Sequence, residues 1–105
     1  MAVKVLGQAA PAATTNTTVY TVAGSKSAVL STVVVCNQGA VGTFSIYVKP
    51  GGGSPTQQNY IFFNAPIDAG ATVPITVGVT MAATDIIGVN VSNASMSVSV
   101  FGDES

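Results

Sequence analysis

Apolar and polar residues alternate along most of this chain. From residue 17 onward the apolar positions recur at a period near two, and Gly, Pro, Asn or Asp stands between the runs. A period of two places successive side chains on opposite faces of an extended strand, and the turn residues separate one strand from the next. The pattern predicts about seven or eight short antiparallel strands. No run has a helical period of useful length.

Two runs indicate which side chains face the core. Phe44, Ile46 and Val48 share one face of a predicted strand, and the residues between them share the other. Residues 95–100 alternate strictly, with serine on one face and Met or Val on the opposite face. Both patterns are typical of strands with one buried face.

Two further runs indicate where strands lie in a sheet. Residues 28–36 are apolar at many successive positions, which predicts a central or interfacial strand that is buried on both faces. Residues 72–79 alternate but contain Pro74, which cannot donate a main-chain hydrogen bond. We therefore expect an edge strand or a bulge at Pro74.

Residues 60–63 form an aromatic cluster, Tyr-Ile-Phe-Phe. Regular alternation puts Tyr60 and Phe62 on one face and Ile61 and Phe63 on the other. A platform for sugars or bases is one interpretation, but no Trp or His accompanies the cluster, so packing is the favoured interpretation. The preceding residues, 50–58, are rich in Gly and Pro and predict an exposed loop.

The start of the chain predicts an extended N-terminal arm. Residues 8–16 are mostly small and include Pro11, which suits an extended segment better than a core element. Such an arm can lie on its own domain or reach a neighbouring subunit. The expected organisation is an arm of residues 1–16 followed by a single β-sandwich domain of residues 17–105.

Charge is scarce in this sequence. Only 7% of the residues are charged, against roughly 25% in an average soluble domain. A surface of this kind suggests that partners cover much of it, although a solvated, hydroxyl-rich surface is the alternative. The three Lys residues are spread out, which argues against nucleic acid as a partner. Thr, Ser, Gly or Asn interrupts every apolar run, which argues against a membrane span. The start of the chain has no basic region that leads into a long apolar core, which argues against an export signal.

Catalytic chemistry has few candidate residues. There is no His, and Cys36 has no partner with which to form an internal disulfide, which fits synthesis in a reducing cytoplasm. Asp68 and Asp85 lie in turn sequences, where aspartate commonly caps its own backbone. We therefore expect no enzyme activity, no catalytic residues, no metal site and no cofactor.

Short motifs spread over nearly the whole chain carry a family resemblance. They are VKVLGQ at 3–8, YTV at 20–22, VVVCN at 33–37, YVKP at 47–50, PI with AG at 66–70, DI with V at 85–89 and FGDE at 101–104. With these motifs the chain resembles small virion proteins of tailed bacteriophages, cyanophages among them. The resemblance implies a β-sandwich incorporated into the particle, in a capsid-decorating (cement) role or in a tail or fibre role.

Together these observations predict a jelly-roll-like antiparallel β-sandwich that is made in the host cytoplasm and ends in the virion. The leading hypothesis is a capsid decoration protein that forms a homo-oligomer, for example a trimer, contacts the major capsid protein or another virion protein, and reinforces the shell. A tail or fibre subunit is the alternative. A carbohydrate-binding module, with Tyr47, Tyr60 and loop Asn residues around a glycan, is the alternative of another class. The candidate contact residues are Val3, Val5, Leu6, Pro11, Tyr47, Tyr60 and Phe63.

Overall fold

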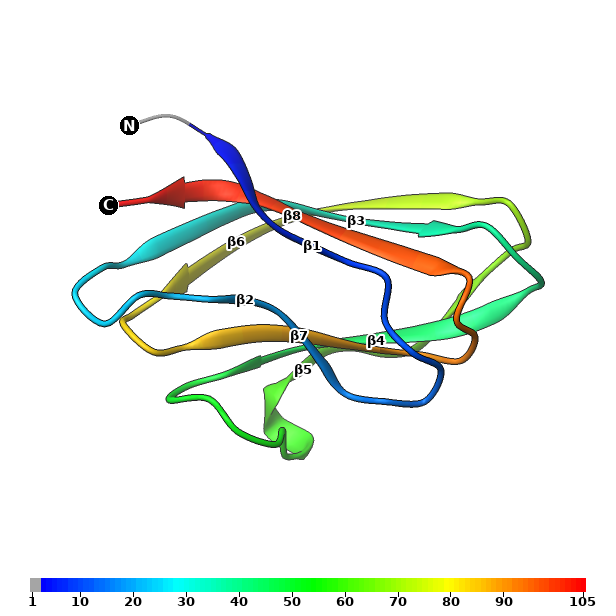
Figure 1. The fold of residues 1–105 in the computed structure, drawn as a ribbon, viewed down its shortest axis with the longest axis horizontal. Coiled ribbons are helices and arrows are strands. Elements are labelled where there is room, and N and C mark those ends of the chain that lie inside the picture. Colours follow the sequence, from blue (N-terminus) through cyan, green and yellow to red (C-terminus); the bar gives the residue numbers. More distant parts are fainter. Residues whose placement is uncertain (1–2) are drawn as a thin grey trace.

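Two four-stranded antiparallel sheets pack face to face (Figure 1). A computed structural model describes residues 3–105, apart from the side chain of Val77. Within this range the elements are β1 (Lys4–Ala9), β2 (Thr17–Thr21), β3 (Ala28–Asn37), β4 (Gly42–Lys49), the short 3-10 helix η1 (Gln57–Asn59), β5 (Tyr60–Ile67), β6 (Thr72–Met81), β7 (Ile86–Val91) and β8 (Met96–Glu104).

The strand order is that of a jelly roll. Sheet A has the order β1-β8-β3-β6 and sheet B the order β2-β7-β4-β5. The first strand thus pairs with the last, β2 with β7, β3 with β6 and β4 with β5, as if one long hairpin were rolled into two layers. Eight strands in this arrangement define the double-sheet jelly roll. The predicted fold class is confirmed.

The core lies between the two sheets and follows the predicted alternation. Phe44 and Ile46 of β4 are buried, as are Met96, Val98 and Val100 of β8. The serines between the β8 residues lie on the opposite, outer side of sheet A and are only half-buried. Alternating apolar and polar side chains suit these strands, because each sheet has one face in the core and one face outside it.

Strand β3 occupies the interior of sheet A, as its apolar run predicts, but only one of its faces is fully buried. Val33 and Val35 point into the core and have no exposed surface. On the outer face Val34 and Cys36 are half-buried, and Val29 is 46% exposed. Strand β6, which contains Pro74, is an edge strand, in agreement with the sequence prediction.

The predicted N-terminal arm is not confirmed. Residues 4–9 form β1, which pairs antiparallel with β8 at the edge of sheet A. The half-buried Leu6 packs against the core, and the Thr14 N–H donates to the Val91 carbonyl at 2.7 Å. Main-chain pairing and this packing hold the segment on its own domain. Residues 1 and 2 of the predicted arm lie outside the described residues.

The C-terminal end of β8 is tied to the opposite sheet through Tyr20. Tyr20 of β2 is buried, and its hydroxyl donates a hydrogen bond to Oε2 of Glu104. The pKa of Tyr20 lies well above its ordinary value, because burial, the hydrogen bond and the negative charge of Glu104 all disfavour the phenolate. Next to this pair, Ser27 and Ser105 exchange two main-chain hydrogen bonds of 3.0 and 2.9 Å.

Removing the Tyr20 hydroxyl should change how stability depends on alkaline pH. In the unfolded chain a tyrosine loses its proton near pH 10, whereas folded Tyr20 keeps it, so the free energy of unfolding falls as the pH rises above about 10. We expect Tyr20→Phe to make this fall less steep. Part of the fall in the free energy of unfolding should remain in this variant, because burial also raises the pKa of Tyr47. Urea unfolding at several pH values between about 8 and 11 measures how steeply the free energy of unfolding falls in the wild type and in Tyr20→Phe. Equal slopes in the two proteins would contradict a raised pKa of Tyr20 as the cause.

Candidate interaction surfaces

Three aromatic side chains form a row on the outer face of sheet B. The rings of Tyr47 on β4 and Tyr60 on β5 meet edge to face with their centroids 5.8 Å apart. Phe63 extends the row, again edge to face, at 5.1 Å from Tyr60. Exposure rises along the row, from 2% for Tyr47 through a half-buried Tyr60 to 67% for Phe63. Phe63 therefore stands in solvent on a buried aromatic support.

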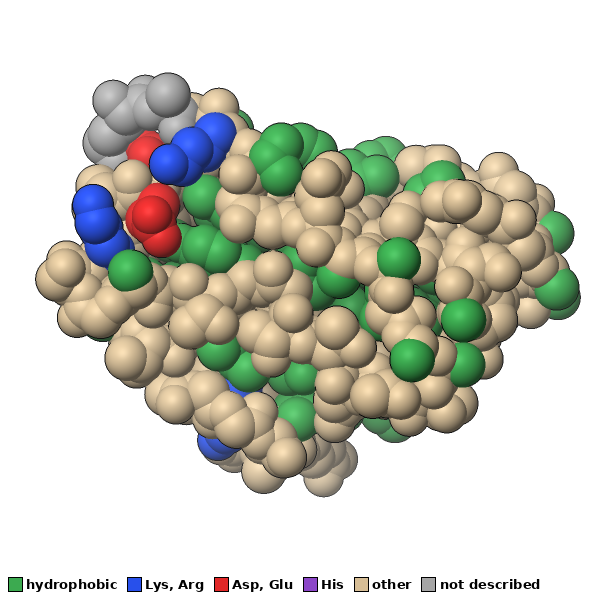
Figure 2. Space-filling view, viewed as in Figure 1, with side chains coloured by type: hydrophobic (Ala, Val, Ile, Leu, Met, Phe, Trp, Pro, Cys, Tyr) green, Lys and Arg blue, Asp and Glu red, His purple; other side chains and the backbone are tan. Residues whose placement is uncertain are grey.

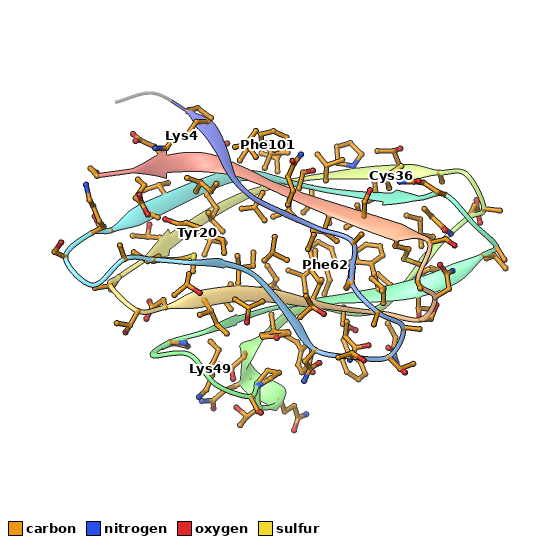
Figure 3. All side chains as sticks on the ribbon, viewed as in Figure 1. Lys4, Tyr20, Cys36, Lys49, Phe62 and Phe101 are labelled. Carbon is orange, nitrogen blue, oxygen red and sulfur yellow. The ribbon has the colours of Figure 1, made fainter. Side chains whose placement is uncertain are left out.

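This row corrects the predicted faces of the aromatic cluster, because Tyr60 and Phe63 lie on the same face. The pairing of β5 with β4 shifts register twice, between Phe44 and Ile46 and between Ile46 and Tyr47. Each irregularity breaks the strict alternation that the sequence prediction assumed. Phe62 points between the sheets toward Phe44, with ring centroids 6.2 Å apart (Figure 3).

A hydrogen bond holds the bulge beside Phe63. Asn64 has a φ of 49°, a left-handed conformation that Asn tolerates better than most residues. Its N–H donates to Oγ of Ser45 at 2.9 Å, and Ser45 is 4% exposed. The available sequence signal was an Asn directly after the aromatic cluster, a residue that favours turns and bulges over regular strand.

The loop of residues 50–59 folds back over the outer face of sheet B (Figure 1). Within it the buried Asn59 accepts hydrogen bonds through Oδ1 from the Thr56 N–H at 2.7 Å and the Thr56 hydroxyl at 3.1 Å. This turn sets Gln57 beside Tyr60 and Phe63, and the three residues line a groove of about 470 Å³, which we call the aromatic groove. A second hollow of about 470 Å³ shares Gln57.

Tyr47 closes the floor beneath the row. Its ring crosses directly over Gly88 of β7, where an added Cβ atom would lie 2.3 Å from ring carbon Cζ. Burial, followed by the neighbouring Tyr60, raises the pKa of Tyr47. The sequence pattern placed Tyr47 and Ser45 on a polar outer face, yet both are buried because β5 and the loop cover them.

The outer face of sheet A forms a second surface, which we call the neutral face. Its paired positions run across all four strands, and Figure 3 shows Phe101 on this outer side. Figure 2 shows a group of charged side chains at the end of the molecule near the two chain ends, and further Lys atoms at the lower edge, on the side of sheet B. Two rows of register partners define the neutral face: Gln8, Ser99, Val34 and Pro74, and Val5, Phe101, Thr32 and Thr76.

The structure divides the candidate contact residues between these surfaces. Tyr47, Tyr60 and Phe63 come together on sheet B, whereas the N-terminal candidates lie on or beside β1 of sheet A. Val3 and Val5 are 68% and 50% exposed. Leu6 is half-buried, and Pro11 and Tyr47 are buried within this chain. The sequence reasoning missed Gln57, which meets the aromatic row only through the turn at Thr56.

The residues with reactive or acidic side chains do not assemble into a site. The Asp85 carboxylate accepts hydrogen bonds of 3.0 Å from the N–H groups of Gly51 and Ala82, which is the expected turn role. Cys36 is a free thiol, half-buried on the neutral face. Among the described residues, no three His, Cys, Asp or Glu side chains gather as metal ligands. Over residues 3–105 no helix has the length and apolar character needed to cross a membrane.

The strand order defines the class of the protein as an eight-stranded jelly roll. Comparison of the chain with models of protein families, with curated proteins and with solved structures finds no match. Since one fold hosts many functions, the jelly roll leaves the function open, and the aromatic groove and the neutral face are the surfaces from which it can be inferred.

Proposed function

We propose that this protein is a structural subunit of a phage particle, a capsid decoration protein that associates with itself and with the shell and reinforces it. The neutral face of sheet A carries the proposal. The resemblance of the chain to small virion proteins and its jelly-roll order, a fold used by viral capsid proteins, support the same role.

A partner can cover the neutral face at low cost, because few strongly hydrated groups would lose their water there. Val5 exposes half of its surface, and Val34 and Phe101 are half-buried. Each Å² of apolar surface that a partner covers contributes roughly 25 cal/mol before the costs of association. The Ser and Thr hydroxyls between these residues can exchange hydrogen bonds with water for hydrogen bonds with a partner. A face with several ionised groups would oppose such burial.

Copy number in purified particles tests the proposed role. Mass spectrometry of the particle should find the protein in hundreds of copies if it decorates the capsid lattice. A few to dozens of copies would instead support the second candidate, a tail or fibre subunit. Absence of the protein from purified particles would contradict both.

A charge placed in the neutral face should weaken association. Val34 lies between Ser99 and Pro74 in the middle of the face, so Val34→Lys brings an ammonium group where the partner packs. We expect binding to heads that lack the protein, and self-association, to weaken at least about tenfold, since a buried unpaired charge is costly. Sedimentation velocity and co-pelleting with heads measure the two effects.

The matched control for this variant is Thr18→Lys. Thr18 is exposed on β2, in the other sheet, so the same charge is added away from the neutral face. Thr18→Lys should bind as the wild type does. Equal behaviour of the two variants, with unchanged thermal midpoints, would contradict the use of the neutral face.

A further inference from the structure

We infer that the aromatic groove is a binding site for a neutral saccharide. This inference does not rest on the proposed function, because the groove lies on the outer face of sheet B and the neutral face on sheet A. Its volume of about 470 Å³ falls within the range of roughly 300 to 1,000 Å³ that is typical of small-molecule sites.

The lining of the groove matches the two kinds of surface on a sugar ring. Tyr60 and Phe63 form an apolar aromatic wall, on which the C–H face of a pyranose can pack. Gln57 stands in the same groove and offers an amide that both donates and accepts. The adjoining hollow is lined by Thr56, Gln57 and Gln58, so hydroxyl and amide groups continue away from the aromatic wall. This combination suits a chain of sugars with alternating C–H and hydroxyl surfaces.

The charge of the lining selects a neutral ligand. The side chains that line the two hollows belong to Thr, Gln, Tyr and Phe, so no Lys, Arg, His, Asp or Glu contributes to the lining. A phosphate, carboxylate or sulfate would lose its hydration without gaining an opposite charge. Neutral hydroxyl groups lose less hydration free energy when they enter the groove, and they can form hydrogen bonds with the glutamine amides there.

The groove is held in shape before any ligand binds. Ser45 fixes the bulge beside Phe63 through its hydrogen bond with Asn64, and the Thr56–Asn59 hydrogen bonds fix the turn beside Gln57. The rings behind Phe63 are packed edge to face onto a buried Tyr47. A site that is already ordered loses less entropy on binding. Bulges of this kind are over-represented next to functional sites.

A second copy of the chain is the competing occupant, and the local surface disfavours it. Ile61 and Phe63 are the two large apolar residues of β5 that are clearly exposed among those the structure describes. A stable protein interface covers about 800 Å² on each partner. Two exposed apolar side chains provide little of that area, whereas the rings of Tyr60 and Phe63 are enough to stack one or two sugar rings.

The test is titration of the full-length protein with four neutral hexasaccharides: cellohexaose, maltohexaose, chitohexaose and mannohexaose. Amide chemical shifts from ¹⁵N NMR and isothermal titration calorimetry report binding and its position. We expect saturable binding of at least one of them, with shifts centred on residues 56–63. Phe63→Ala should weaken it about tenfold or more, because an aromatic anchor is lost, and Phe63→Trp should retain it.

The control variant is Val41→Ala, which also truncates an exposed apolar side chain (68% exposed) but lies in the turn before β4. It should bind the hexasaccharide as the wild type does, and far-UV circular dichroism should be unchanged in every variant. The inference is overturned if no hexasaccharide binds at millimolar concentration, or if Phe63→Ala and Val41→Ala bind equally. A shift of Phe63→Ala from oligomer to monomer, without saccharide binding, would overturn it in favour of a second copy. Binding of particles by Phe63→Ala should stay intact, which separates this test from that of the neutral face.

Discussion

Replacing Asn37 by Asp is expected to lower the free energy of unfolding by about 3 kcal/mol or more at neutral pH, the largest loss that we predict. Asn37 has no exposed surface. Its Nδ2 group donates toward the carbonyl oxygens of Ala40, Asp68 and Ile67 at 2.8, 3.2 and 3.4 Å. Its Oδ1 accepts from the Gly39 N–H at 3.0 Å. An aspartate of the same shape removes the donor and sets a carboxylate against carbonyl oxygens.

The loss in Asn37→Asp should shrink as the pH falls. Burial and the facing carbonyl oxygens place the pKa of the new carboxyl above its ordinary value, because both disfavour the charged form. Its protonated form can donate one hydrogen bond. A group whose folded pKa is raised contributes most stability below its unfolded pKa, near 4, and loses it as the pH rises. The variant should therefore approach the wild type in mild acid.

Urea unfolding of the wild type and the variant at neutral and acid pH measures this prediction. The control is Asn16→Asp, at an exposed position where the side-chain oxygen already accepts from Nδ2 of Asn90 at 2.9 Å. An aspartate keeps that acceptor, so the change should stay within about 0.5 kcal/mol. If the two variants lost equal stability, the buried hydrogen bonds of Asn37 would not be the cause.

Gly88→Ala is expected to cost about 2 to 3 kcal/mol, although it adds a single methyl group to a strand. The new Cβ would lie 2.3 Å from Cζ and Oη of Tyr47, and the ring is buried with little room to move away. Displacing the Tyr47 ring also removes the support of Tyr60. Saccharide binding in the aromatic groove should therefore weaken together with stability.

Gly78→Ala is the matched control, because an added Cβ meets nothing within 4 Å there. In β6 that change should be neutral or stabilising by about 0.5 kcal/mol, since alanine restricts the unfolded chain more than glycine does. Combining Gly88→Ala with Tyr47→Ala should cost less than the sum of the single changes, because the clash is gone. Additive losses in thermal or urea unfolding would rule out the contact with Tyr47 as the cause.

The sequence predicted most of the fold through local signals. Phe44 and Ile46, and Met96, Val98 and Val100, point inward as their period of two requires. Pro74 lies on an edge strand, because a residue without an N–H is poorly suited to the interior of a sheet. These predictions succeed because alternation and proline geometry act within a few neighbouring residues.

The sequence predictions failed where distant segments decide the outcome. The start of the segment predicted to be an extended arm forms β1 and pairs with β8, nearly a whole chain length away in sequence. The two register shifts of β5 depend on how β4 lies beside it, so alternation alone wrongly put Tyr60 on the same face as Phe62. The Asn37 side chain donates to the carbonyl oxygens of residues 67 and 68, which only folding brings near it.

By itself the sequence determined an all-β, charge-poor chain with few groups for catalysis and with alternating core positions in strands such as β4 and β8, because these properties follow from residue type and local period. Tertiary structure decided which strands pair, and with that the neutral face and the aromatic groove. The reason is physical: a surface is made of side chains from strands that are neighbours in a sheet but not in the chain. Gln57, Tyr60 and Phe63 form a site only because a turn and a bulge bring them to one face.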